Sequence, residues 1–444
     1  MFRQLIWGLG IGRRRIPVLA HDRHAYEVLS RPGLLWTEYL YLAIIGLVAF
    51  IVANPFSLPF RQAGLTKHVG LVLTVPLLVL HFLARAVGRS QQDDKFSEFL
   101  ARAWPLLAMA IMVVLGSVYA SRVDKISNNF LSMGMYIPIF AFSGYVLLTT
   151  TAPQRFLKIY FAIWAMSSAT MAALVVVTVG KVKVYHEEIF LIVPMAVFFV
   201  LMPWPKLICW AAGLAFLAIG VLSRKNTSHL VGLLTLLYFL LAVWLPLRRE
   251  GRDRRIFAFL KGYVATCALL AMVAGTVFLI LHKEQYLPSG NSEYRLHTYR
   301  LALNKFLDSP IWGTGFTESS SHRFSLYHVA TGTQVLPVHS DIMDILAHGG
   351  MIGIFFWAFG LWKIASIAYR RLLQPRLLTS WWTPYAHTLA LSSLCALVVY
   401  AFNPVITSIP ALAYLLWTNL GLLLGLALRV QTESTKPSRD GFGT

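Results

Sequence analysis

The segment VHSDIMDILAHGGMIG, residues 338–353, places ionisable side chains and closely spaced glycines at the start of a long apolar run. Imidazole can accept a proton from a hydroxyl group near neutral pH. In a helix, His339 and His348 would lie on opposite faces, so the two cannot hold one metal ion together. Asp344 precedes His348 by one helical turn, which predicts an internal hydrogen bond between them. His339 is then left at the outer lip of the helix, where it can face the preceding loop.

The same segment carries a signal for close packing. Gly349 and Gly353 are spaced so that they share one face of a helix. Such a pair of small residues lets the backbone of a neighbouring membrane helix approach closely. The spacing therefore predicts a tight helix contact just after the histidines.

Two arginines could complete a reaction site with His339. Arg224 lies in LSRKNTSHL, residues 222–230, at the outer end of a predicted span, and Arg295 lies in the first turn of a predicted loop helix. Guanidinium groups match phosphate oxygens in geometry and stay charged. Each residue alone is more typical of an ordinary membrane interface, where arginines snorkel and histidines are solvated. Their combination on one face predicts a bound phosphate beside a base.

The composition predicts that membrane-spanning helices hold these residues in place. The chain has 444 residues, of which 57% are hydrophobic and 13% charged, with a mean hydropathy of +0.63. Such a chain has too few polar side chains to cover the surface of a water-soluble globule. The composition therefore predicts an all-α polytopic membrane protein with about twelve transmembrane helices. The predicted spans are 35–53, 69–87, 102–120, 131–150, 156–178, 188–204, 207–222, 230–247, 256–282, 342–367, 385–403 and 409–429.

The distribution of positive charge predicts the orientation. With the N-terminus inside, two thirds of the 39 Lys and Arg residues fall on the inner side, as retention of cations in the cytoplasm requires. Both termini are therefore expected in the cytoplasm. The net charge of +20 is explained by this topology and by attraction to membrane lipids, so no nucleic-acid partner is expected.

One long outer connection separates the spans into parts. Residues 1–282 are expected to hold an N-terminal cytoplasmic segment and the first nine helices, and residues 341–444 the last three and a cytoplasmic tail. Between them, residues 283–340 form a large outer loop. Apolar side chains in this loop recur at helical spacing and end at DSP, residues 308–310; they are Leu296, Tyr299, Leu303, Phe306 and Leu307. The loop should therefore contain an amphipathic helix on or near the membrane surface.

No metal or other cofactor is expected. Among the acidic residues of the outer face, Glu187, Glu188, Glu293 and Glu318 show no recognisable ligand spacing. They are interpreted as solvated or salt-bridged side chains. Asp341 could orient a basic residue, although solvation at a helix mouth explains it equally well.

The histidine segment resembles the signature of the O-antigen ligase family. The signature consists of a histidine, a small polar residue, nine further residues and then Gly-x-x-Gly. In this sequence it matches His339, Ser340, Gly350 and Gly353. This motif is fairly specific.

Two weaker motifs support the resemblance. RLHTYRLALNKFLDSPIWGTGF, residues 295–316, is similar to the family pattern of an arginine, an aromatic residue and a helix ending in Pro-x-x-Gly-x-Gly. The family usually has tryptophan where this chain has Tyr299. SRKN, residues 223–226, resembles the family's Ser-Arg at the end of a mid-chain span. The resemblance extends over the whole chain in topology and concentrates in these three motifs in sequence.

The resemblance implies a glycosyltransferase of the bacterial inner membrane. Such an enzyme transfers O-antigen polysaccharide from undecaprenyl pyrophosphate to the lipid A-core oligosaccharide, with its active site facing the periplasm. By similarity, Arg224 and Arg295 would bind the donor pyrophosphate, and His339 would act as the general base. Arg300, Tyr299 and Ser340 are secondary candidates. Arg300 is rotated away from the Arg295 face of the predicted helix, and contact with lipid phosphate alone is the alternative role for it.

Alternatives remain open at this point. An O-antigen polymerase and a protein O-oligosaccharyltransferase share the superfamily and the donor lipid, and they differ in the acceptor. A polytopic transporter would be expected to show charges within the membrane or matching broken helices, and the sequence shows no internal repeat. Because no carboxylate nucleophile is identifiable, a single displacement with inversion at the anomeric carbon is favoured.

Overall fold

The polytopic helical fold is confirmed in a computed structural model of the chain. The structure describes residues 33–53, 69–86, 93–121, 130–177, 189–222, 226–244, 291–317, 321–323, 335–338, 340–374, 377–378, 380–402 and 410–434. Among these residues, seven helices are long and apolar enough to cross a membrane. Every predicted span except 256–282 overlaps a helix or a helix pair. That span lies outside the described residues, so the total of twelve stays a prediction.

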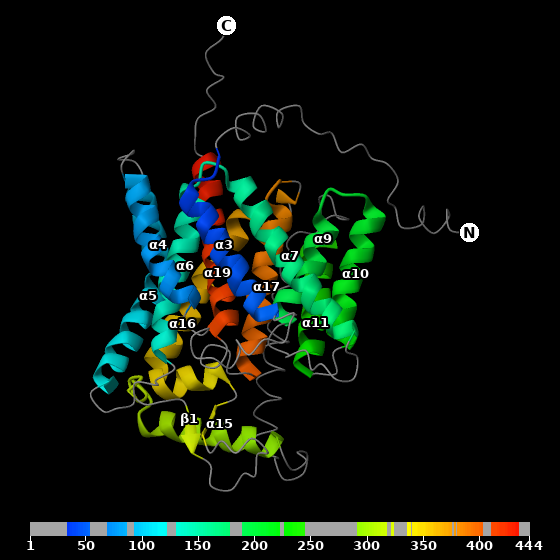
Figure 1. The fold of residues 1–444 in the computed structure, drawn as a ribbon. Helices are drawn as coiled ribbons and strands as arrows, with labels where there is room; N and C mark the ends of the chain where they lie inside the picture. The colour runs from blue at the N-terminus through cyan, green and yellow to red at the C-terminus, as the bar shows by residue number, and fades with distance from the viewer. Residues whose placement is uncertain are drawn as a thin grey trace, which may run out of the picture.

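The helices follow one another as an antiparallel bundle (Figure 1). They are α3 (Trp36–Ala53), α4 (Val69–Ala86), α5 (Asp93–Ser121), α6 (Phe130–Thr149), α7 (Pro153–Val177), α8 (Ile189–Ile192), α9 (Met195–Leu201), α10 (Lys206–Leu222), α11 (Asn226–Tyr238) with its π-helical continuation η4 (Phe239–Trp244), α15 (Asn291–Asp308), α16 (Asp341–Arg371), α17 (Thr383–Phe402) and α19 (Pro410–Ser434). The helix α15 lies across one end of the bundle, which we call the α15 end. The last turns of α19 lie at the opposite end.

A small departure from the all-helical expectation occurs in the outer loop. Strand β1 (Ser321–Arg323) pairs antiparallel with β2 (Val335–Pro337), with His322 opposite Leu336. The ribbon ends two residues before His339 in the sequence. It therefore closes the loop directly in front of the histidine motif.

The closest helix packing joins α6 to α19. A Cβ atom built on Gly425 would lie 2.5 Å from the carbonyl oxygen of Gly144, and one built on Gly421 would meet the backbone of α6 as well. Small residues allow such contacts in membrane proteins, where helices associate by packing and interhelical hydrogen bonds. Buried hydroxyl pairs such as Thr74 with Tyr414, whose oxygens lie 2.8 Å apart, add interhelical hydrogen bonds. This rigid core supports the helices that carry the site.

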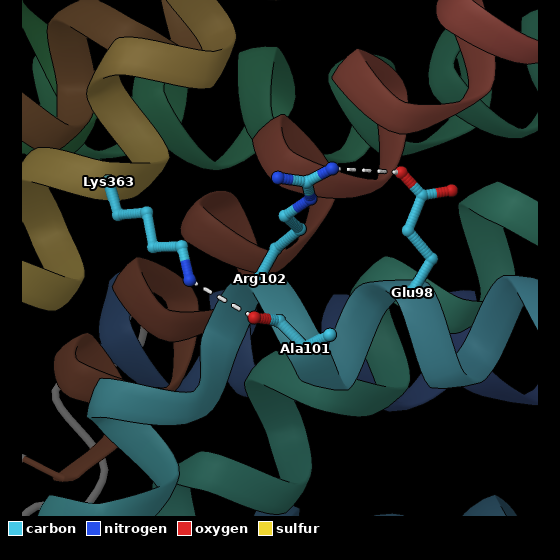
Figure 2. Close-up of polar contacts among 4 residues, drawn as sticks. All are labelled: Glu98, Ala101, Arg102 and Lys363. Carbon is cyan, nitrogen blue, oxygen red and sulfur yellow. Dashed lines mark hydrogen bonds and ion pairs between the residues drawn. The ribbon is translucent and has the colours of Figure 1, made fainter.

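Helix α5 contains a backbone acceptor that its own helix cannot satisfy. Pro105 lies inside α5 and has no N–H to donate to the carbonyl oxygen of Ala101, one turn earlier. The ammonium group of Lys363 on α16 donates to that oxygen at 3.0 Å, as Figure 2 shows, and lies 5.8 Å from the ring centroid of Trp104. Lys363 thus replaces the missing helical donor and joins α5 to α16.

Replacing Lys363 by methionine should lower thermal stability, because the Ala101 carbonyl would lose its donor while the apolar stem remains. We expect a loss of about 1 kcal/mol. Pro105→Ala would restore the helical N–H. The loss caused by Lys363→Met should therefore be smaller in the Pro105→Ala background than in the wild type. Thermal unfolding of the four proteins in one detergent measures this coupling, and purely additive effects would contradict the assignment.

Candidate functional site

The loop helix α15 ends where the sequence predicts, but the burial of its described side chains differs from the predicted apolar stripe. It ends at Asp308 and packs against α16. Among the α15 residues whose burial the structure describes, Thr298 and Ala302 are buried, whereas Leu303 and Leu307 are 36% and 63% exposed. Small side chains face α16 because the two helices lie close together. The exposed leucines remain available for lipid, which is consistent with the expected position at the membrane surface.

Helix α16 is broken rather than continuous. Ser340 caps its start by accepting a hydrogen bond from the Met343 N–H at 3.3 Å. Gly350 then has φ 59° and ψ −159°, which interrupts the helix. In Figure 1 the yellow start of α16 lies beside α15, and the golden remainder rises into the bundle. The part of the histidine motif from Asp341 to Gly349 therefore forms a short helix at the bundle end.

The turn after α15, residues 309–316, is bonded into this break. Around Gly350, backbone N–H and C=O groups of α16 that lack partners within the helix form hydrogen bonds with the backbone of the turn. Buried peptide groups require such partners. The bonds run from Thr314 N to Ala347 O (3.2 Å), Phe316 N to His348 O (3.0 Å), Met351 N to Pro310 O (2.9 Å) and Ile352 N to Ile311 O (3.2 Å). The turn and the break thus form one backbone joint, which we call the 309–316 joint.

Two facing glycines make the joint possible. Gly313 and Gly350 both have φ 59°, a left-handed conformation that suits glycine. A Cβ on Gly313 would lie 2.5 Å from the Ala347 oxygen, and one on Gly350 would lie 2.6 Å from the Gly313 nitrogen. The Pro-x-x-Gly-x-Gly motif and the glycine at 350 are therefore two halves of one structural device.

The predicted helix contact at Gly349 and Gly353 is wrong in its partner. The ring of Phe316 packs over both glycines: a Cβ on Gly349 would lie 2.9 Å from Phe316 Cζ, and one on Gly353 would lie 3.8 Å away. Phe316 is fully buried and has φ 59°, which is uncommon for a residue with a side chain. The small residues accommodate this anchoring ring rather than a neighbouring helix.

The predicted hydrogen bond between Asp344 and His348 is also wrong. The Nδ1 atom of His348 lies 2.7 Å from the Thr314 hydroxyl, so His348 fastens the joint. Both carboxyl oxygens of Asp344 are buried and have no hydrogen-bond partner among the described residues. The imidazole turns toward Thr314 because the joint brings that hydroxyl into reach, which helical spacing alone does not reveal.

Two of the predicted site residues converge on the end of α17. The Arg295 Nη1 donates to the carbonyl oxygen of Phe402 at 3.4 Å, while its buried Nε has no partner within the described part of the chain. The Ser340 hydroxyl donates to the carbonyl oxygen of Tyr400 at 3.5 Å. Segments far apart in sequence therefore place a guanidinium group and the residue next to His339 at the same helix end.

The structure describes some of the remaining predicted site residues and not others. His339 and Arg224 lie outside the described residues, so their positions stay predictions. Arg300 is exposed, on a different side of α15 from the half-buried Arg295 and Tyr299. Burial raises the pKa of the Tyr299 phenol, and the positive charge of Arg295 partly offsets that rise. Tyr299 therefore stays a neutral aromatic neighbour of the guanidinium group.

Sequence reasoning missed the contribution of α17. Helix ends leave their last carbonyl groups without helical donors, and these carbonyls orient Arg295 and Ser340. The signal was present as Asn403-Pro404, because a proline disfavours helix at the preceding residue. Beneath this end, Asp341 interacts electrostatically with the phenols of Tyr136 and Tyr400. These residues form the floor of the candidate site.

An apolar cavity adjoins the floor. It has a volume of about 260 Å³ and lies between α11, α16, α17 and α19, with Trp357, Tyr400 and Trp417 among its lining residues. Tyr400 thus lines the cavity and also accepts the Ser340 hydrogen bond through its carbonyl oxygen. The described residues contain no group of three His, Cys, Asp or Glu side chains placed to hold a metal ion.

Residues 210–358 match the family model described as O-antigen ligase. The matched range includes Arg224, Arg295, His339 and the whole 309–316 joint. No curated protein matches the chain.

Proposed function

We propose that the chain is a metal-independent O-antigen ligase, because residues 210–358 match the family model described as O-antigen ligase. In this proposal it transfers O-antigen polysaccharide from undecaprenyl pyrophosphate to the lipid A-core oligosaccharide. The observation that carries the proposal is the convergence of Arg295 and Ser340 on the end of α17, since Ser340 is the direct neighbour of His339.

The proposed reaction is a single displacement. A sugar hydroxyl of the acceptor attacks the anomeric carbon of the donor glycan, and the carbon–oxygen bond to pyrophosphate breaks. His339 accepts the hydroxyl proton, and undecaprenyl pyrophosphate leaves as an anion. Arg295 and Arg224 stabilise the charge that develops on the leaving group. The configuration at the anomeric carbon inverts, and a product with the donor's configuration would contradict this step.

The surroundings of Arg295 suit an anionic ligand. Its one observed hydrogen bond is long, 3.4 Å, and its Nε is buried with no partner in the described part of the chain. A buried guanidinium group with unused donors is stabilised when a phosphate oxygen approaches it. The donor pyrophosphate would supply such oxygens.

The adjoining cavity suits a lipid-linked substrate. Its walls are almost entirely apolar, and it begins at Tyr400, beneath the residues that flank the proposed chemistry. Polyprenyl chains remain in the bilayer while their head groups project outward. The α15 end would accordingly face the periplasm, with both termini on the cytoplasmic side of the inner membrane.

The acceptor class separates this proposal from its relatives. Purified protein would be incubated with an undecaprenyl-pyrophosphate glycan and, in separate reactions, lipid A core, a second donor lipid or an acceptor protein. Each reaction would be run with and without a chelator. We expect transfer to lipid A core at an unchanged rate in the chelator. Products formed only with the second donor or only with protein would indicate a polymerase or a protein O-oligosaccharyltransferase instead.

A further inference from the structure

A second cluster of charged side chains lies toward the opposite end of the bundle from α15. It is formed by Glu98 and Arg102 on α5 and by Lys363 and Arg371 on α16, and we call it the α5–α16 cluster. Figure 2 shows Arg102 directed toward Glu98, with Lys363 approaching the same stretch of α5. The proposed transfer reaction uses none of these residues.

Positive charge exceeds negative charge in the cluster. Arg102 lies within electrostatic range of both Lys363 and Arg371, so three cations share one neighbourhood. Among the side chains that the structure describes, Glu98 is the carboxylate that interacts with Arg102 and Arg371. Its oxygen lies 3.8 Å from the Arg102 Nη2, a long contact between half-exposed side chains, and such pairs contribute little. Among the described side chains, the three cations of the cluster therefore outnumber its one carboxylate.

The donors of the cluster are only partly used. Lys363 donates one hydrogen bond to the Ala101 carbonyl oxygen, and this bond holds the ammonium group between α5 and α16. The Nη1 of Arg371 is buried and has no hydrogen-bond partner among the described residues. A buried guanidinium nitrogen without an acceptor is costly, and an incoming anion would remove that cost.

Aromatic residues place the cluster at the level of lipid head groups. Trp104, Trp362 and Tyr369 flank it and are 44%, 61% and 49% exposed. Tryptophan and tyrosine gather at the interface between membrane and water, where one edge of the ring is apolar and the other wet. Exposed aromatic side chains around a group of cations provide the environment of a phospholipid phosphate.

We propose that the α5–α16 cluster binds the phosphate of an anionic phospholipid in the leaflet opposite the α15 end. Arg102 and Arg371 would bind the phosphate oxygens, and Lys363 would add charge while holding the two helices together. Basic pockets between membrane helices bind anionic head groups in this way. The site is independent of the proposed transferase activity, because it lies at the other end of the bundle.

Native mass spectrometry can test this site. The full-length protein would be purified in a neutral detergent and titrated with phosphatidylglycerol, with phosphatidylcholine and with inorganic phosphate. We expect one tightly retained phosphatidylglycerol. In Arg102→Gln/Arg371→Gln its affinity should fall roughly 10- to 30-fold, since two head-group contacts are lost. Arg155→Gln, which removes an exposed arginine near the start of α7, is the matched control and should bind like the wild type.

Several results would overturn the proposal. These are equal phosphatidylglycerol affinity in the double variant and the wild type, equal retention of phosphatidylcholine, or saturation by inorganic phosphate with no preference for lipid. If the double variant does not remain monodisperse, Arg371→Lys serves in its place. It keeps the charge but loses the paired donors. It should bind with reduced affinity, and unchanged affinity would count against the site.

Discussion

Arg295→Ala is expected to lower the rate of glycan transfer by about 10²–10³-fold, the usual effect of removing one donor to a developing negative charge. The Arg295 guanidinium group lies against the end of α17, and its Nε has no hydrogen-bond partner among the described residues. The leaving pyrophosphate gains negative charge as its bond to the sugar breaks. The measurement is single-turnover transfer from an undecaprenyl-pyrophosphate glycan to lipid A core. His339→Ala and Arg224→Ala are expected to cause losses of the same order.

Arg300→Ala supplies the matched control for Arg295→Ala. Arg300 lies on the same helix and carries the same charge, but its side chain is exposed. Its replacement should leave single-turnover transfer within about threefold of the wild type, as is usual for an exposed surface side chain. Equal losses in the two variants would show that general charge at the membrane surface matters, and that Arg295 has no specific role.

Gly350→Ala is expected to abolish activity by opening the 309–316 joint. An alanine at φ 59° costs about 1–2 kcal/mol, and its Cβ would collide with the Gly313 nitrogen at 2.6 Å, adding about 1–3 kcal/mol. Because the joint fixes α15 to α16, Arg295 would no longer be held against α17. The measurements are thermal unfolding and limited proteolysis between α15 and α16, alongside transfer activity.

Alanine substitutions at two other glycines provide graded comparisons for Gly350→Ala. Gly315→Ala places a side chain at φ 65° but in open space, with the nearest atom 3.9 Å away, so only the conformational cost remains. Gly353→Ala has ordinary contacts, with the Ile345 oxygen 3.6 Å away, and should be tolerated. Thermal stability should therefore fall from Gly353→Ala to Gly315→Ala to Gly350→Ala. A different order would mean that the joint does not carry the stability.

Periodicity and hydropathy predicted much of the fold. The bounds of α15 followed from its helical spacing and from Pro310, and the spans followed from apolar runs too long for any other role. These features are local, since a helix in lipid satisfies its own backbone. The family resemblance was also visible in sequence, because its histidine motif is short and continuous.

The connections between segments could not be predicted in this way. His348 bonds to Thr314 and not to Asp344, and Gly349 packs against Phe316 and not against a helix. The 309–316 joint brings these residues into contact although more than thirty positions separate them in the sequence. The role of α17 depends likewise on backbone carbonyls, which every residue has and which no sequence pattern marks. Only three-dimensional placement shows which of them are used.

The backbone joint makes α15 and the start of α16 move as a rigid body. Four peptide hydrogen bonds and an interlocked pair of glycines would have to separate before α15 could swing outward like a lid. A mobile cover over the site is therefore disfavoured, and long substrates should enter sideways from the bilayer. Turnover would then depend on lateral diffusion of lipids, and it should respond to bilayer fluidity more than to the viscosity of the surrounding water.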